Sequence, residues 1–172
     1  MTHIGTSGSL GFTRLAINGL SPEGMQPMTY KQVSWAANGE IYNWKELKNR
    51  LHLDHTSESD CSVLGALWTL HRHDPTTFFR ALDGVFALLL IDEETGITTV
   101  GRDPYGVRPL FYVQVGETLW FSSEMKGLKE VCGHNTIRAV KPGTYMQINT
   151  QEGGEPSSPS IIRCRGSRTQ RS

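Results

Sequence analysis

The sequence lacks any uninterrupted apolar stretch of the roughly 18 to 20 residues that a membrane-spanning helix requires. Its first residues also lack the basic start and the apolar core that are typical of a secretory signal. These two absences predict a cytoplasmic protein that has no membrane partner.

An excess of charge of one sign is missing too, because 17 acidic side chains balance 17 basic ones. Surfaces that bind nucleic acids are usually strongly basic, so we expect no nucleic-acid partner. Cysteine is scarce: Cys61, Cys132 and Cys164 are odd in number, and their spacing matches neither a disulfide framework nor a zinc site. We therefore expect no metal site in this chain.

The length of 172 residues suits one domain with a core of its own. Apolar patterning continues to about residue 150, and we expect residues 1–150 to form this domain. From about Gln151 onward, turn-forming and polar residues and then arginines replace the pattern. Residues 151–172 are therefore predicted to be a disordered polar and basic tail.

Within the domain, the patterning predicts strands and helices in alternation. Strands are expected over residues 9–18, 33–42, 85–91, 97–101, 109–115, 119–122 and 143–148, and helices over 44–51, 59–72, 77–82 and 124–130. Ser59 is the predicted N-cap of the second helix, and the apolar stripe of that helix consists of Val63, Leu64, Leu67 and Leu70. The continuously apolar strand 85–91 should be buried on both faces, which fits a layered α+β body.

The most informative segment is the hexapeptide Asn38-Gly39-Glu40-Ile41-Tyr42-Asn43. Asn-Gly is the commonest signal for a tight hairpin turn, which is one interpretation of this segment. Alternatively, the side-chain amide of Asn38 and the N–H of Gly39 can donate two hydrogen bonds to one oxygen, as an oxyanion hole requires. The carboxylate of Glu40 can then hold a cationic amine.

Further blocks in a fixed order favour the second interpretation. They are Arg14-Leu15-Ala16-Ile17, Gly24-Met25-Gln26-Pro27-Met28, Ser59-Asp60, Leu82-Asp83-Gly84-Val85-Phe86-Ala87, the segment from Gly101 to Phe111, and Ser123-Glu124-Met125-Lys126-Gly127-Leu128. In this order the set resembles the N-terminal glutaminase domain of glutamine-hydrolysing asparagine synthetase, a class II glutamine amidotransferase. The resemblance implies an Ntn-hydrolase-type four-layer α/β/β/α sandwich, here truncated at its N-terminus.

The resemblance also implies the substrate, glutamine, and a set of site residues. Asn38 and Gly39 match the oxyanion hole. The remaining glutamine-binding residues would be Arg14 at the α-carboxylate, Glu40 and Asp60 at the α-ammonium, and Leu15 and Ile17 through their backbones. Arg102 and Asp103 are expected to be structural, as an ion pair or as stabilisers of a turn.

In the family, the nucleophile is a cysteine at the mature N-terminus, with its own α-amine as the base. Only thirteen residues precede Arg14, and they include no cysteine. We therefore expect the nucleophile to be absent and the chain to be an incomplete, catalytically impaired fragment. Its family function would be hydrolysis of glutamine to glutamate and ammonia, which feeds asparagine synthesis from aspartate.

Two alternatives remain open: a non-catalytic glutamine-binding or regulatory module, and another class II amidotransferase. The resemblance implies that ATP and Mg belong to a synthetase domain, which is missing from this chain or separate from it. It also leaves a homodimer open.

Overall fold

The computed structural model describes residues 2–4, 8–10, 25–53, 58–149 and 157–162. The described elements are, in chain order, β1 (Thr2–Ile4), β2 (Gly8–Leu10), β3 (Met28–Tyr30), β4 (Val33–Ile41), α1 (Trp44–Arg50), η2 (Asp60–Val63), α2 (Leu64–His71), α3 (Pro75–Ala81), β5 (Gly84–Asp92), β6 (Ile97–Arg102), β7 (Phe111–Val115), β8 (Thr118–Ser122), α4 (Met125–Cys132), β9 (Arg138–Ala139), β10 (Thr144–Asn149) and β11 (Ser160–Ile161).

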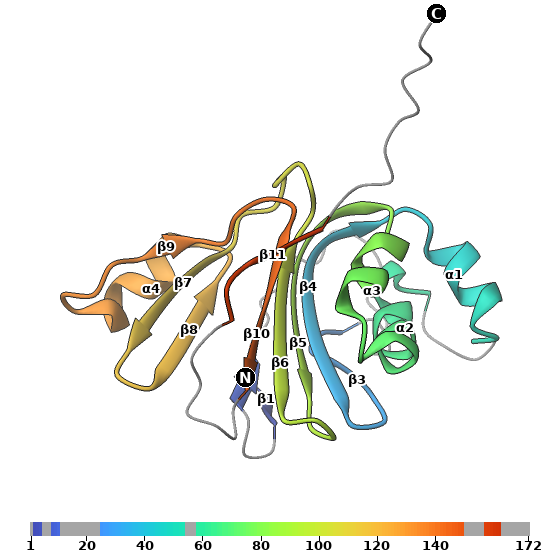
Figure 1. The fold of residues 1–172 in the computed structure, drawn as a ribbon, viewed down its shortest axis with the longest axis horizontal. Helices are drawn as coiled ribbons and strands as arrows, with labels where there is room; N and C mark the ends of the chain where they lie inside the picture. The colour runs from blue at the N-terminus through green and yellow to red at the C-terminus, as the bar shows by residue number, and fades with distance from the viewer. Residues whose placement is uncertain (1, 5–7, 11–24, 54–57, 150–156, 163–172) are drawn as a thin grey trace, which may run out of the picture.

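A six-stranded antiparallel sheet forms the centre of the fold, in the order β11-β10-β6-β5-β4-β3. A smaller sheet, in the order β8-β7-β9, lies on one side of it, and helices α1, α2 and α3 lie on the other (Figure 1). Strands β1 and β2 pair only with each other among the described strands.

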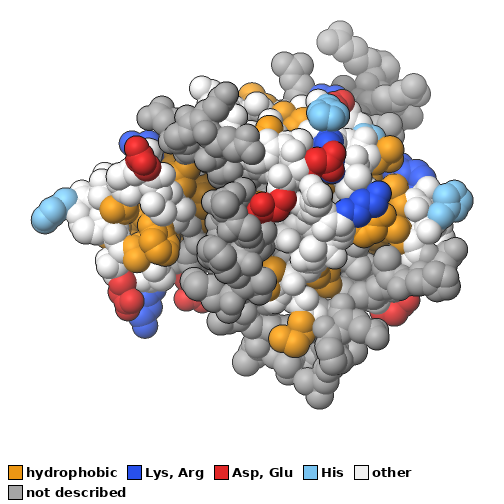
Figure 2. Space-filling view, turned by 90° about the horizontal axis from the view of Figure 1, so that it is seen from below, with side chains coloured by type: hydrophobic (Ala, Val, Ile, Leu, Met, Phe, Trp, Pro, Cys, Tyr) orange, Lys and Arg blue, Asp and Glu red, His pale blue; other side chains and the backbone are white. Residues whose placement is uncertain are grey.

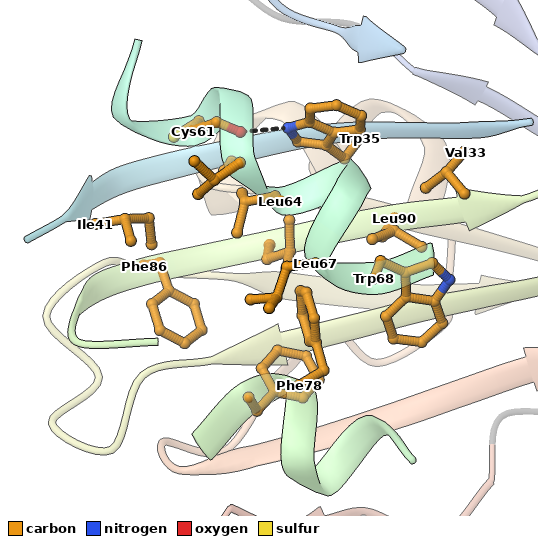
Figure 3. Packing of buried hydrophobic residues seen from close by; sticks show 14 of the residues in the cluster. Val33, Trp35, Ile41, Cys61, Leu64, Leu67, Trp68, Phe78, Phe86 and Leu90 are labelled. Carbon is orange, nitrogen blue, oxygen red and sulfur yellow. Dashed lines mark hydrogen bonds between the residues drawn. The ribbon is translucent and has the colours of Figure 1, made fainter. Parts of the chain in front are cut away.

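The larger core lies between the central sheet and the helices. Every second residue of a strand points to the same face, so Trp35 of β4 and Leu90 of β5, which are opposite each other, both face α2. Figure 3 shows these side chains packed with Leu67, Trp68 and Phe78 of the helical layer. The rings of Trp68 and Phe78 meet edge to face, with centroids 5.1 Å apart.

A second core fills the space between the two sheets. It contains Ala87 of β5, Val100 of β6 and Met146 of β10, against which Tyr112 and Phe121 of the small sheet pack. Helix α4 packs on β7 and β8 as the outermost layer. The layers are therefore α/β/β/α, and the predicted α+β four-layer architecture is confirmed.

Strand β5 is buried on both faces, as its continuous apolar run predicts. Phe86, Leu88 and Leu90 lie in the helix-side core, whereas Ala87 faces the small sheet. Both neighbours of β5 in the sheet, β4 and β6, pair with it along most of their length.

The segment around residue 59 differs from its prediction in two ways. Ser59 precedes η2 and makes no side-chain capping bond, and the chain runs through one 3-10 turn before α2 begins at Leu64. Leu70, assigned to the apolar stripe, is 64% exposed. Within α2, Leu64, Leu67 and Trp68 form the buried face. At about 100° per residue, Leu70 lies roughly 120° around the helix from the centre of this face, so it points away from the sheet.

The predicted tail also differs in part. Residues 160–161 form β11 on the edge of the central sheet, where Thr144 is opposite Ile161. Ile162 is buried, and its N–H donates to the carbonyl of Gly143 at 2.7 Å. The prediction of disorder is therefore wrong for residues 157–162, because an apolar pair inside a polar segment completes the sheet edge. The other tail residues lie outside the described part, and the domain boundary stays a prediction.

Within the described segments, no helix is both long enough and apolar enough to cross a membrane. On the face shown in Figure 2, acidic and basic side chains are dispersed among one another. This dispersion agrees with the equal numbers of the two signs in the sequence.

Candidate functional site

Asn38, Gly39 and Glu40 lie in the last part of strand β4 and not in a hairpin turn. Asn38 is opposite Ala87 of β5 and Gly39 is opposite Phe86. The turn interpretation of Asn-Gly is therefore wrong for this segment. A continuous partner strand on one side fixes the backbone, and the chain reverses only beyond Ile41.

Gly39 has a backbone conformation that side chains rarely allow, with φ at +148°. A Cβ atom added there would lie less than 3.0 Å from the carbonyl oxygen of Val85 and from Cα of Phe86. Only glycine fits between β4 and β5 at this point.

The outer edge of β4 is covered by a strand along only part of its length. Strand β3 pairs with Val33 to Trp35 and then ends. Beyond it, the side-chain amide of Gln26 bonds both backbone groups of Ala37: Oε1 accepts from the N–H at 2.5 Å, and Nε2 donates to the carbonyl at 2.9 Å. Farther along, a carboxylate oxygen of Asp60 accepts from the N–H of Ile41 at 2.7 Å.

Between these two side-chain contacts lies the N–H of Gly39. In an antiparallel strand, alternate residues direct their backbone groups to the same neighbour, so the N–H groups of Ala37, Gly39 and Ile41 share the outer edge. Among the described residues, none is recorded as an acceptor for the Gly39 N–H. In the described part of the chain, this edge thus has one N–H without a recorded acceptor, between two N–H groups that are hydrogen-bonded.

The side chains of Asn38 and Glu40 lie on the opposite face of the sheet from the helices, since both alternate with the buried Ala37 and Ile41. Asn38 is half-buried and Glu40 is exposed. Within the described ranges, no hydrogen bond to the Asn38 amide and no ion pair of Glu40 is recorded. In the described part of the chain, the carbonyl oxygen and the NH2 group of Asn38 and the carboxylate of Glu40 therefore lie beside the Gly39 N–H without a recorded partner.

Asp60 reaches this edge because η2 is anchored on β4. The indole N–H of Trp35 donates to the backbone carbonyl of Cys61 at 3.0 Å, the contact drawn as a dashed line in Figure 3. Asp60 is thereby held beside Ile41, the residue after Glu40. The structure thus brings four predicted site residues, Asn38, Gly39, Glu40 and Asp60, to one end of β4.

The thiol of Cys61 does not take part in this arrangement. It is buried in the core, and this burial, together with the neighbouring Asp60 carboxylate, raises the pKa of the thiol far above its ordinary value. A thiol with such a pKa stays protonated at neutral pH and is a poor nucleophile.

Arg102 and Asp103 hold the turn that follows β6. The guanidinium of Arg102 donates to the backbone carbonyls of Gly106, Arg108 and Val140. The buried carboxylate of Asp103 accepts from the N–H groups of Phe86 and Tyr105. Of the two structural roles predicted for this pair, the structure favours turn stabilisation.

Arg14, Leu15 and Ile17 lie outside the described residues, and their assigned contacts stay predictions. Gln26 was not predicted as a site residue. It occurs in the sequence only as part of the Gln-Pro block, and no local pattern links it to Ala37, eleven positions away.

Comparison with known proteins identifies the family. The family model that describes the glutamine amidotransferase domain matches residues 2–155 of the sequence. The chain belongs to this family. The matched segment contains every element described above except β11.

The curated relatives of this glutamine amidotransferase domain include asparagine synthetases. This chain is 36% identical over 143 residues to a probable asparagine synthetase (glutamine-hydrolyzing) of Acanthamoeba polyphaga mimivirus. The match covers 81% of this chain and 25% of the relative. The chain is 41% identical over 152 residues to the asparagine synthetase (glutamine-hydrolyzing) of Brassica oleracea, covering 84% of the chain and 24% of the relative. The chain thus spans about a quarter of the length of these relatives.

Solved structures support the same fold. The glutamine phosphoribosylpyrophosphate amidotransferase of B. subtilis, complexed with ADP and GMP, superposes with a TM-score of 0.66 at 28% identity, over 83% of this chain and 34% of that one. A glutamine aminotransferase class-II domain protein of Silicibacter pomeroyi shares the fold at 16% identity, with a TM-score of 0.52, over 77% of this chain and 70% of that one.

Proposed function

We propose that this domain binds free glutamine at the end of β4 and belongs to an asparagine synthetase-type glutaminase. The observation that carries the proposal is the pair of donors formed by the N–H of Gly39 and the side-chain amide of Asn38, for which no partner is recorded among the described residues. Two such donors suit the amide carbonyl oxygen of glutamine, and they bind still more strongly to the oxyanion that forms when a nucleophile attacks that carbonyl.

The charged end of glutamine fits the other residues of the site. Glu40 and Asp60 place two carboxylates near the end of β4, and an α-ammonium between them relieves their mutual repulsion. The α-carboxylate then needs a cation, the role that the family resemblance gives to Arg14, with Leu15 and Ile17 as backbone contacts. A planar guanidinium is well suited to bind a carboxylate through two parallel hydrogen bonds.

The reaction class is acyl transfer. A nucleophile attacks the amide carbon, the C–N bond breaks, ammonia leaves with a proton supplied by the base, and water then releases glutamate. Asn38 and Gly39 would contribute the binding of the oxyanion. In the whole protein, ammonia would pass to a synthetase domain that uses ATP and Mg to make asparagine from aspartate, and this chain would need no cofactor of its own. We place this activity in the cytoplasm.

A second candidate function is glutamine binding without cleavage. The observation that favours it is the state of Cys61, since this cysteine, which directly follows Asp60 in the chain, is buried and protonated. An ammonia-release assay on the purified chain separates the two functions. Turnover supports the glutaminase, whereas saturable binding without ammonia supports the binding module.

Isothermal titration calorimetry with glutamine tests the site that both functions share. We expect saturable binding that weakens about ten-fold or more in Glu40→Gln and in Asn38→Ala, because each change removes one hydrogen-bonding or charged contact. The control is Glu130→Gln, an exposed residue of α4 on the far side of the small sheet, which should bind as the parent does. Absence of heat at millimolar glutamine, with the parent folded by circular dichroism, would refute the proposal.

A further inference from the structure

We infer that Gln26 is a positioning residue for the oxyanion-binding segment, acting through the backbone of Ala37. The inference rests on the proposed function, since it concerns the same pair of donors, Asn38 and Gly39.

The geometry begins with the register of β3 on β4. Met28 is opposite Trp35 and Tyr30 is opposite Val33. Continued by two residues, the same register would place Gln26 opposite Ala37. The backbone ladder of β3 on β4 nevertheless ends at Met28.

The side chain of Gln26 takes over where the strand stops. Its carboxamide offers one acceptor and one donor, the same pair that a backbone peptide offers. Both are used on Ala37, at 2.5 Å and 2.9 Å. A half-buried side chain thus occupies the ladder position that the backbone of β3 leaves vacant.

The position of this contact makes it relevant to the site. Ala37 directly precedes Asn38, and its backbone groups share the outer edge of β4 with the N–H of Gly39. On its other side this segment is fixed by β5, and at its far end by Asp60. Among the described residues, Gln26 makes the only recorded contacts with the outer edge between Trp35 and Ile41, and both oxyanion donors lie in that interval.

The inference predicts a selective effect on ligand binding. Gln26→Ala should weaken glutamine binding about ten-fold, as expected when two hydrogen bonds that position a donor are lost. Norvaline keeps the α-ammonium and the α-carboxylate but has no side-chain amide, so its affinity should change less than two-fold. A general loss of structure would weaken both ligands equally.

The matched control is Thr29→Ala. Thr29 also makes a cross-strand contact between β3 and β4, from its hydroxyl to that of Ser34 at 3.1 Å, but this contact does not touch Ala37. We expect the control to lower the melting temperature without changing the affinity for glutamine. Equal weakening of glutamine binding in the two variants would overturn the inference.

Gln26→Glu provides a test that does not depend on the truncated side chain. A carboxylate can accept from the Ala37 N–H but repels the Ala37 carbonyl, whereas the protonated acid can bond both groups. The affinity of this variant for glutamine, relative to the parent at the same pH, should therefore recover as the pH is lowered through the pKa of the new carboxyl group. A ratio that stays constant with pH would overturn the inference.

The NMR chemical shifts of amide groups in the ligand-free protein distinguish a failure of the positioning role of Gln26 from a failure of the proposed glutamine binding. If Gln26→Ala shifts the Gly39 N–H and the Asn38 side-chain amide, the positioning role holds even where the parent binds no glutamine. If these resonances stay in place while the parent binds glutamine, the positioning role is refuted and the proposed function stands.

Discussion

The carboxylate of Asp103 accepts a hydrogen bond of 3.1 Å from the backbone N–H of Phe86, the residue opposite Gly39 in the sheet. The turn after β6 is thereby fastened to β5 directly behind the candidate oxyanion donors. The backbone of Asp103 adds a second link, since its N–H donates to the Phe86 carbonyl at 2.9 Å. One buried acidic residue thus joins the turn, β5 and, through β5, the site.

We expect Asp103→Asn to lower the free energy of unfolding by about 2–3 kcal/mol, because the new NH2 group would face backbone N–H donors in a buried setting. Urea denaturation followed by tryptophan fluorescence measures the change. The exposed Glu130→Gln serves as the control and should be neutral. A change below about 0.5 kcal/mol for Asp103→Asn, the range of ordinary surface substitutions, would contradict the assigned role.

Gly39→Ala should be among the most damaging single changes in the chain. The added methyl group would press on the Val85 carbonyl at an unfavourable φ, and we expect a loss of about 3 kcal/mol or more. Thermal melting monitored by circular dichroism measures it.

The control for this change is Gly116→Ala. Gly116 also has a positive φ, of 60°, but a Cβ there would meet nothing within 4 Å. Gly116→Ala should lower the stability by only about 1 kcal/mol, which is the cost of the positive φ for alanine without any steric clash. Similar losses at the two positions would mean that the close approach of β4 to β5 has no energetic consequence.

Asp74, the N-cap of α3, should contribute a pH-dependent term to stability. The hydroxyl of Thr77 donates to its carboxylate at 2.5 Å and the backbone N–H of Thr77 at 3.1 Å, and these bonds hold the pKa of Asp74 below its ordinary value. A lowered folded-state pKa means that the contribution is fully present above the unfolded-state pKa and is lost as the pH falls through the folded-state value.

Asp74→Asn keeps a capping oxygen but cannot ionise. The stability difference between parent and variant should therefore be constant near neutral pH and should shrink below about pH 4, where the unfolded carboxyl group is half-protonated. Melting temperatures measured from pH 7 to pH 3 test this expectation. A difference that grows on acidification would have the wrong sign.

The two described cysteines should differ in reactivity. Cys61 is buried with a raised thiol pKa, whereas Cys132, at the end of α4, is half-exposed. In a Cys164→Ser background, Ellman's reagent at neutral pH should modify Cys132 within minutes, and Cys61 only after denaturation. Intact mass and peptide mapping identify the labelled position, and rapid native labelling of Cys61 would contradict the assigned burial.

Much of the fold could be predicted from periodicity, because burial imposes it. The continuous apolar run of β5 follows from its central place in the sheet, with helices on one face and the small sheet on the other. By contrast, β3 has only three residues, of which one is buried and one is exposed, and this is too short a stretch to show alternation. Leu70 was assigned wrongly because the buried face of α2 is centred on Leu64, Leu67 and Trp68, and Leu70 lies to one side of it.

Some residues of the candidate site could likewise be predicted from the sequence, and others could not. Asn38 and Gly39 could be predicted because a short motif marks them, although their placement inside a strand overrides the turn preference of Asn-Gly. The role of Gln26 could not be predicted, since it depends on the end of one strand and on a contact between side chain and backbone across eleven residues. Such contacts leave no periodic trace in a sequence.

The outer margin of β4 has one more consequence. A strand with a free margin can recruit an extended segment from another molecule and so begin self-association. Here any incoming peptide would first have to displace the carboxamide of Gln26 and the carboxylate of Asp60 from their backbone partners. In the described part of the chain, the two side chains thus protect this margin from strand addition on either side of the Gly39 N–H.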